Sequence, residues 1–138
     1  METKLKLASI IAILLLPFAG HLTSNGWATE AVGYQNITVD QFTEMMDHKD
    51  FILINVHIPY SGEIEETDLL LPYEAIEQQK EKLPDDKESK IVVYCMSGPM
   101  GNIAAAKLAA IGYRWVFHFQ GGMLAWKNAG NRLVNRSE

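Results

Sequence analysis

The sequence predicts one α/β domain with a central parallel sheet of about five short strands and helices on both faces. Short, nearly unbroken apolar runs at 51–58, 91–95 and 115–119 are typical of strands that are buried on both faces. Segments with helical periodicity separate these runs, and strands that alternate with helices favour a parallel sheet. The 138 residues of the chain suffice for one such domain.

The first 28 residues are predicted to be a secretory signal peptide. Lys4 and Lys6 precede an apolar run at 7–19, and the polar stretch that follows ends in small residues at Ala28. The apolar run has about 13 residues, whereas a bilayer span needs roughly 20, so an uncleaved membrane anchor is the weaker alternative. We therefore expect cleavage near Ala28 and a secreted or periplasmic protein without membrane association.

The domain is expected to open with a short strand and then a helix from about Thr38 to Asp47. Phe42, Met45 and Met46 recur at i, i+3 and i+4, so they share one face of that helix. The run at 51–58, rich in Ile and Val, then forms the first long buried strand.

A polar loop at 59–68, a very short strand at 69–71 and a helix at 72–83 follow. Pro72 suits the first turn of that helix, where its missing N–H costs little. A solvated loop at 84–90 leads to the next strand. The acidic side chains of the first loop, which we expect to be solvated rather than to bind a cation or a basic partner, are Glu63, Glu65, Glu66 and Asp68.

The second half of the chain repeats the strand–helix pattern twice. The strand at 91–95 precedes an Ala-rich helix that begins near Met100 and ends at Gly112. The strand at 115–119 precedes a last helix that ends at Gly130.

Cys95 is the only cysteine, and it lies where a buried strand meets a helix. A lone cysteine is most often a buried apolar side chain, which is the ordinary interpretation. In parallel sheets, however, ligands bind beyond the carboxyl ends of the strands, and the first N–H groups of a helix there favour an anion. Such a position favours the thiolate, and Gly98 lets the loop curl around it. We therefore interpret Cys95 as a nucleophile.

A strand that ends in Cys95, a Cys-x-x-Gly loop and an Ala-rich helix resemble the rhodanese family. The similarity extends over residues 34–131 and leaves 132–138 as a C-terminal tail. The closing segment resembles the family pattern Gly-Gly-x-x-Ala-Trp-x-x-Ala-Gly at Gly121, Gly122, Ala125, Trp126, Ala129 and Gly130.

The resemblance implies a single rhodanese-like domain that acts as a sulfurtransferase. Such a protein takes sulfane sulfur from a small donor such as thiosulfate onto Cys95 as a persulfide, and passes it to a thiol or cyanide acceptor. No metal or organic cofactor is required. The resemblance also implies a backbone cradle around the persulfide, formed by Met96, Ser97, Gly98, Pro99, Met100 and Gly101.

Four positions depart from the family pattern, and one of them is Glu63, where the family has His. Met100 stands where the loop usually has Arg, and Asn55 and His57 replace an Asp and an Arg of the earlier strand. We expect Asn55 and His57 to contribute to the rim beside Cys95. Losing a fixed cation should cost binding of a dianion on the order of a few kcal/mol, because charge-assisted hydrogen bonds are the strong ones.

The sequence leaves two functions open and disfavours two others. Sulfur transfer through Cys95, with thiosulfate or a less charged donor, is the main hypothesis, and a rhodanese-like binding or sulfur-carrier module without catalysis is the alternative. A phosphatase or arsenate reductase needs an Arg in the loop, which is missing. The net charge of −5, without a basic cluster, argues against nucleic acid. Of the remaining candidate cations, His118 is expected to line the core and Arg114 to lie in an exposed turn.

Overall fold

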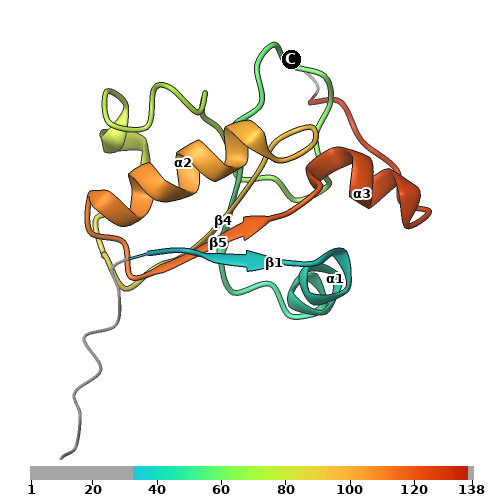
Figure 1. Cartoon of the computed structure of the whole chain (residues 1–138), viewed down its shortest axis with the longest axis horizontal. Helices are drawn as coiled ribbons and strands as arrows, with labels where there is room; N and C mark the ends of the chain where they lie inside the picture. The colour runs from blue at the N-terminus through green and yellow to red at the C-terminus, as the bar shows by residue number, and fades with distance from the viewer. Residues whose placement is uncertain (1–32, 137–138) are drawn as a thin grey trace, which may run out of the picture.

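The computed structural model describes residues 33–136, so the predicted signal peptide and its cleavage site lie outside the described residues. In this range no helix is both long and apolar enough to span a membrane. Five parallel strands form one sheet in the order β1-β5-β4-β2-β3 (Figure 1). The strands are β1 (Gln35–Ile37), β2 (Ile52–Asn55), β3 (Leu69–Leu70), β4 (Lys90–Tyr94) and β5 (Trp115–Phe119).

Three α-helices cover the two faces of the sheet: α1 (Val39–Asp47), α2 (Pro99–Ala110) and α3 (Gly122–Asn128). Helix α2 packs on one face, where β4 contributes Ile91 and Val93 to the core. Helices α1 and α3 pack on the other face, where Val92 and Tyr94 of β4 are buried. Figure 1 shows α2 and α1 on opposite sides of the sheet. The predicted α/β architecture is confirmed, and β4 is apolar at consecutive positions because both of its faces are covered.

The start of α1 is encoded locally by a capping box. The Thr38 hydroxyl accepts from the Gln41 N–H at 3.3 Å, and the Gln41 side chain accepts from the Thr38 N–H at 2.9 Å. Phe42 of this helix stacks on Phe119 at a centroid distance of 4.4 Å and meets Trp126 edge-on at 5.5 Å. The predicted helix is confirmed, with Thr38 as its cap, and Trp126 packs against the core beside it.

The predicted helix at 72–83 is wrong. Only a short 3₁₀ helix, η1 (Lys80–Lys82), forms there, and the rest consists of turns. The Leu71 N–H donates to the Asn55 carbonyl and the Tyr73 N–H to the Val56 carbonyl, so the backbone stays paired along the edge of β2 beyond β3. Edge pairing thus holds the chain extended where the Pro72 pattern suggested a helix start.

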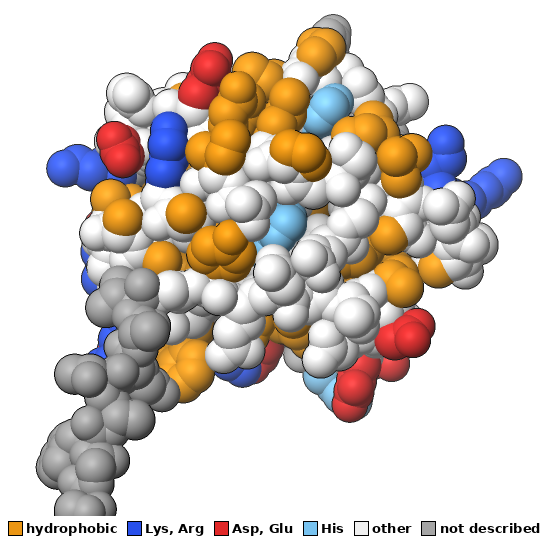
Figure 2. Space-filling view, in the orientation of Figure 1, with side chains coloured by type: hydrophobic (Ala, Val, Ile, Leu, Met, Phe, Trp, Pro, Cys, Tyr) orange, Lys and Arg blue, Asp and Glu red, His pale blue; other side chains and the backbone are white. Residues whose placement is uncertain are grey.

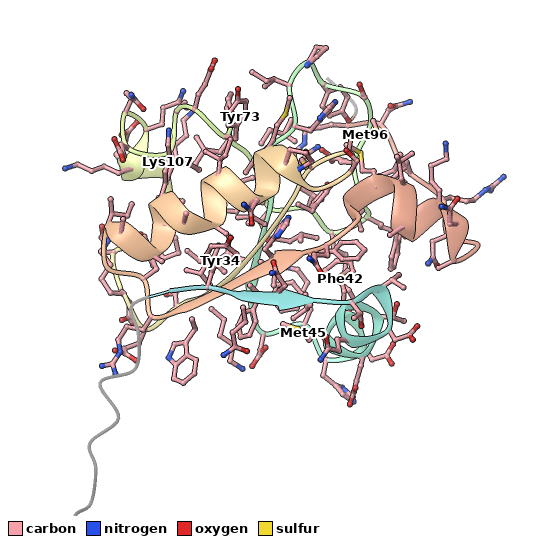
Figure 3. All side chains as sticks on the ribbon, in the orientation of Figure 1. Tyr34, Phe42, Met45, Tyr73, Met96 and Lys107 are labelled. Atoms are coloured by element: carbon pink, nitrogen blue, oxygen red, sulfur yellow. The ribbon has the colours of Figure 1, made fainter. Side chains whose placement is uncertain are left out.

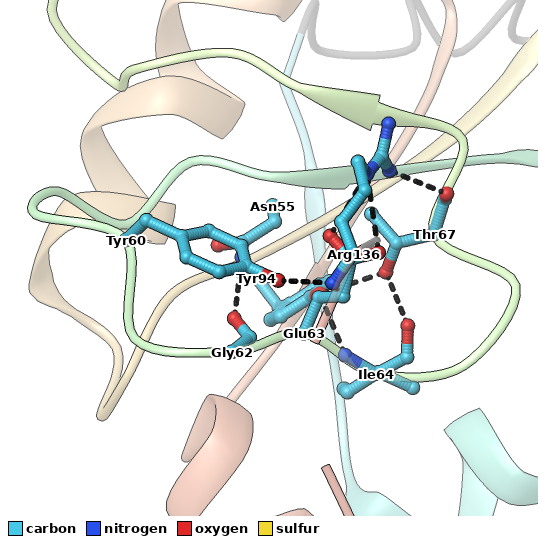
Figure 4. A network of polar contacts seen from close by, with 8 residues as sticks. All are labelled: Asn55, Tyr60, Gly62, Glu63, Ile64, Thr67, Tyr94 and Arg136. Atoms are coloured by element: carbon cyan, nitrogen blue, oxygen red, sulfur yellow. Dashed lines mark hydrogen bonds and ion pairs between the residues drawn. The ribbon is translucent and has the colours of Figure 1, made fainter. Parts of the chain in front are cut away.

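The loop at 57–68 is tied to the C-terminal segment of the chain, as Figure 4 shows. Glu63 and Val134 form an antiparallel bridge with backbone hydrogen bonds of 2.9 and 2.8 Å. The Arg136 guanidinium donates to the Glu63 carboxylate at 3.2 Å and to the Thr67 carbonyl at 3.0 Å. The Tyr60 hydroxyl accepts from the Arg136 N–H at 2.8 Å. These contacts hold the loop against residues 134–136.

The expectation that all four acids of this loop are solvated is wrong for Glu63. Glu63 is only 6% exposed and is paired with Arg136. Asp68 accepts from the Leu53 N–H and from the Lys49 ammonium, each at 2.7 Å, and so fixes the loop to the sheet. Glu65, Glu66 and Asp68 are exposed, as expected, although Asp68 also makes these two contacts.

The Tyr94 hydroxyl lies at the centre of the same network. It accepts from the Ile64 N–H at 2.9 Å and lies 2.7 Å from the Thr67 hydroxyl. Burial raises the pKa of Tyr94 to about 12. Because β4 ends at Tyr94, this hydroxyl couples the loop to the strand that carries Cys95.

Replacing Tyr94 with Phe should lower the free energy of unfolding by about 1–3 kcal/mol, since it leaves the buried Ile64 N–H without an acceptor. Urea unfolding followed by circular dichroism measures this change. Tyr73→Phe is the matched control, expected within about 0.5 kcal/mol of the parent protein because no hydrogen bond of its hydroxyl is found among residues 33–136. Equal effects of the two substitutions would contradict this role of Tyr94.

Candidate active site

Cys95 follows the last residue of β4 and is only 1% exposed. Its carbonyl accepts from the Met123 N–H at 2.9 Å, and the next carbonyl, of Met96, accepts from the Leu124 N–H at 3.0 Å. The start of α3 therefore holds the backbone around the cysteine. A Cβ on Gly122 would lie 2.0 Å from the Cys95 carbonyl oxygen, so only glycine fits at this approach.

The loop after Cys95 curls so that its backbone faces the sulfur. Gly98 adopts a φ of +132° and its N–H donates to the Cys95 Sγ at 3.0 Å. Helix α2 begins at the next residue, Pro99, one position earlier than predicted. Pro99 occupies the first helical position, where its missing N–H costs little. The first turn of α2 therefore directs its free N–H groups towards the loop.

The other residues of the predicted cradle occupy different environments. Met96 packs against the core on the α1 and α3 side, and Figure 3 shows it close to where α2 and α3 begin. Met100 packs against the core on the α2 side. Ser97 is exposed, and Gly101 is a buried residue of the first turn of α2.

Asn55 and His57 lie at the edge of the sheet where Cys95 lies, but Asn55 supports the loop instead of facing the sulfur. Asn55 is paired with Tyr94 in the sheet and is 2% exposed. Its Nδ2 donates to the Gly62 carbonyl at 3.1 Å, and its Oδ1 accepts from the His57 N–H at 3.0 Å. These bonds turn the chain out of the sheet, so β2 ends at Asn55 and not at residue 58 as predicted. His57 is half-buried.

His118 of β5 lies closer to the cysteine loop than sequence reasoning indicated. It is paired with Val93 and belongs to the α2 face of the sheet, the face on which Val93 and Cys95 lie. A Cβ on Gly101 would lie 2.7 Å from the His118 Nε2 and 3.6 Å from the Cys95 N, so Gly101 separates the imidazole from the cysteine backbone. In the sequence, Gly101 is the residue that could have indicated this proximity, because a side chain at position 101 would displace the His118 imidazole.

The His118 imidazole is buried and hydrogen-bonded on one side. It is 3% exposed, and its Nδ1 lies 2.8 Å from the Asn36 Oδ1. Its Nε2 has no hydrogen-bond partner among residues 33–136. Burial lowers the pKa of His118. The expectation of a core histidine is confirmed, and the ring is neutral at pH 7.

A cavity of about 330 Å³ adjoins the cysteine loop. No Asp, Glu, Lys or Arg side chain lines it within the part of the chain that the structure describes. Arg114 lies in an exposed turn, as expected. This turn precedes the first residue of β5, at the end of the strand away from the cysteine loop, and the Arg114 guanidinium pairs there with the Glu88 carboxylate at 3.3 Å. In Figure 2 the charged side chains lie mainly around the edge of the face shown. The lining residues are Ser97, Gly98, Pro99, Asn102, His118, Gln120 and Gly121.

Comparison with known proteins identifies the family. Residues 38–129 match the family described as Rhodanese-like domain. The chain belongs to this family. The resemblance inferred from Cys95 and from the closing Gly-Gly segment is therefore confirmed.

Relatives and structures support the same assignment. The chain is 31% identical over 93 residues to a sulfurtransferase of Allochromatium vinosum, a match that covers 65% of this chain and 84% of that protein. It is 28% identical over 96 residues to a tRNA uridine(34) hydroxylase of Yersinia enterocolitica, where the match covers 65% of this chain but only 27% of the relative. A rhodanese-related protein of Thermoplasma volcanium superposes with a TM-score of 0.62 at 20% identity, over 73% of this chain and 98% of that one.

The lowered pKa of His118 predicts a loss of stability in mild acid. As the pH drops below the ordinary value of 6.5, His118 takes up a proton in the unfolded chain but stays neutral in the folded chain. The free energy of unfolding therefore decreases as the pH is lowered, until the pKa of His118 in the folded chain is reached. His118→Gln should flatten this fall between pH 6.5 and about pH 5, above the range in which most carboxylates titrate. Urea titrations across this range test the effect.

The matched control is His48→Gln, the same substitution at an exposed position outside the cavity. An unaltered pH dependence in His118→Gln would contradict the assignment.

Proposed function

We propose that this protein is a rhodanese-type sulfurtransferase in which Cys95 is the nucleophile. The observation that supports this most directly is the Gly98 N–H, which donates to the Cys95 Sγ at 3.0 Å where α2 begins. Donors from a helix start stabilise a thiolate and then an anionic persulfide at the same place. Family membership and the sulfurtransferase relative support sulfur chemistry in general.

The proposed reaction has two balanced steps. The Cys95 thiolate attacks the outer sulfur of the donor, the donor S–S bond breaks, and the leaving group departs with the electron pair. With thiosulfate the products are the Cys95 persulfide anion and sulfite. A thiolate or cyanide acceptor then attacks the outer sulfur and regenerates the Cys95 thiolate. The backbone of residues 96–101 is proposed to hold the persulfide, and no cofactor takes part.

A second candidate is a sulfur carrier or binding module that does not turn over. Two features favour an absence of turnover with thiosulfate as the donor. Met100 occupies the position of the usual loop Arg, and, among the described residues, the cavity lining carries no cation that could bind this dianion. The 1% exposure of Cys95 also restricts access to the sulfur. On the sequence of residues 1–28 we further propose that the protein acts in a secreted or periplasmic setting.

Cys95→Ser should abolish sulfur loading, because a hydroxyl does not form a persulfide. Intact-mass spectrometry after incubation with thiosulfate, or with an organic persulfide, should show the parent protein gain one sulfur atom that dithiothreitol removes. Thermal unfolding of both proteins checks that the substitution preserves the fold. A mass gain that persists in Cys95→Ser, or a parent protein that no donor loads, would overturn the proposal.

Met100→Arg should accelerate loading from thiosulfate about tenfold or more, since a charge-assisted hydrogen bond to the dianion is worth about 1.5–3 kcal/mol. Met100→Leu is the matched control for packing against the core on the α2 side. The rate of mass gain under excess thiosulfate is the measurement. Equal rates in the two variants would show that the missing cation does not limit the reaction.

A further inference from the structure

The cavity beside the cysteine loop points to the class of sulfur donor, an inference that rests on the proposed function. We infer that this cavity binds an uncharged hydrogen-bonding group, such as an amide, of an organic persulfide. The persulfide end of the same molecule then reaches Cys95. The cavity thus selects a donor by its organic part and not by negative charge.

The chemistry of the lining carries this inference. Ser97, Asn102 and Gln120 offer a hydroxyl and two carboxamides, and within the described residues no charged side chain completes the wall. The neutral imidazole of His118 lines the same cavity. A dianion placed there gains no cation, whereas an amide exchanges water for neutral hydrogen bonds with these side chains. A volume of about 330 Å³ is at the lower end of the range for small-molecule sites.

Asn102 is oriented before any ligand binds. The Tyr34 hydroxyl donates to the Asn102 Oδ1, and the backbone N–H of Asn102 donates to the Gly98 carbonyl at 2.9 Å. Figure 3 shows Tyr34 between β1 and α2. With Oδ1 engaged, the Asn102 Nδ2 remains available to donate to a ligand carbonyl. A side chain held in this way loses little entropy on binding.

The cavity and the sulfur share a wall. Residues 97–99 line the cavity, and the N–H of Gly98 in that wall contacts the Cys95 Sγ. A molecule with its amide in the cavity therefore lies against the same loop whose Gly98 N–H contacts the Cys95 sulfur. The Cys95 thiolate attacks the outer sulfur of RSS⁻, the S–S bond breaks, RS⁻ leaves, and the Cys95 persulfide anion forms.

Two persulfides that differ in one group test the inference. N-acetylcysteamine persulfide carries a neutral amide, and ethyl persulfide lacks it. In the parent protein we expect the amide compound to load Cys95 about tenfold faster at subsaturating concentration, as one or two neutral hydrogen bonds allow. Acid-quenched samples followed by intact-mass spectrometry give both rates.

Asn102→Ala combined with Gln120→Ala should bring the ratio of the two loading rates close to one, because the variant lacks both carboxamides that the ligand amide would contact. Gln78→Ala, at an exposed position outside the cavity, should retain the preference. Equal loading of the parent protein by both compounds, or an undiminished preference in the double variant, would overturn the inference while the proposed function stands. Loading by neither compound nor by thiosulfate would overturn the proposed function itself.

Discussion

The site depends on the contact between the start of α3 and the backbone around Cys95. Two hydrogen bonds, from Met123 and Leu124 to the carbonyls of Cys95 and Met96, fix the direction in which the chain leaves β4. Gly122 makes this approach possible, since a side chain would collide with the Cys95 carbonyl. The two motifs that identify the family are therefore two sides of one contact, although more than 20 residues separate them.

The electrostatics of the site follow from what surrounds this contact. The sulfur receives a hydrogen bond from the Gly98 N–H, which is a dipole and not a full charge. His118 lies next to the loop, but burial lowers its pKa and keeps it neutral at pH 7. Backbone dipoles in a buried setting stabilise an anionic sulfur without a cation. The same backbone dipoles stabilise a bound dianionic donor less than the positive charge of an Arg in the loop would.

The edge of the sheet beside the site is stabilised by a separate network. Asn55 turns the chain after β2, and Glu63 joins the following loop to Arg136. The Tyr94 hydroxyl joins this loop to the end of β4, one residue before the cysteine. Asn55 therefore has a local structural role: its side chain holds the turn and the loop that follow β2.

By itself the sequence determined the α/β class, the buried strands and the position of Cys95 between a strand and a helix. These features depend on apolar periodicity, capping residues and glycine positions, which act over a few neighbouring residues. Only the tertiary structure decided that residues 72–83 do not form an α-helix, that Glu63 is buried, and that His118 lies beside the cysteine loop. Each of these depends on contacts between distant segments: pairing along β2, an ion pair with Arg136, and the space left by Gly101. Local patterns contain no information about such contacts, because the partner is chosen only when the sheet and helices come together.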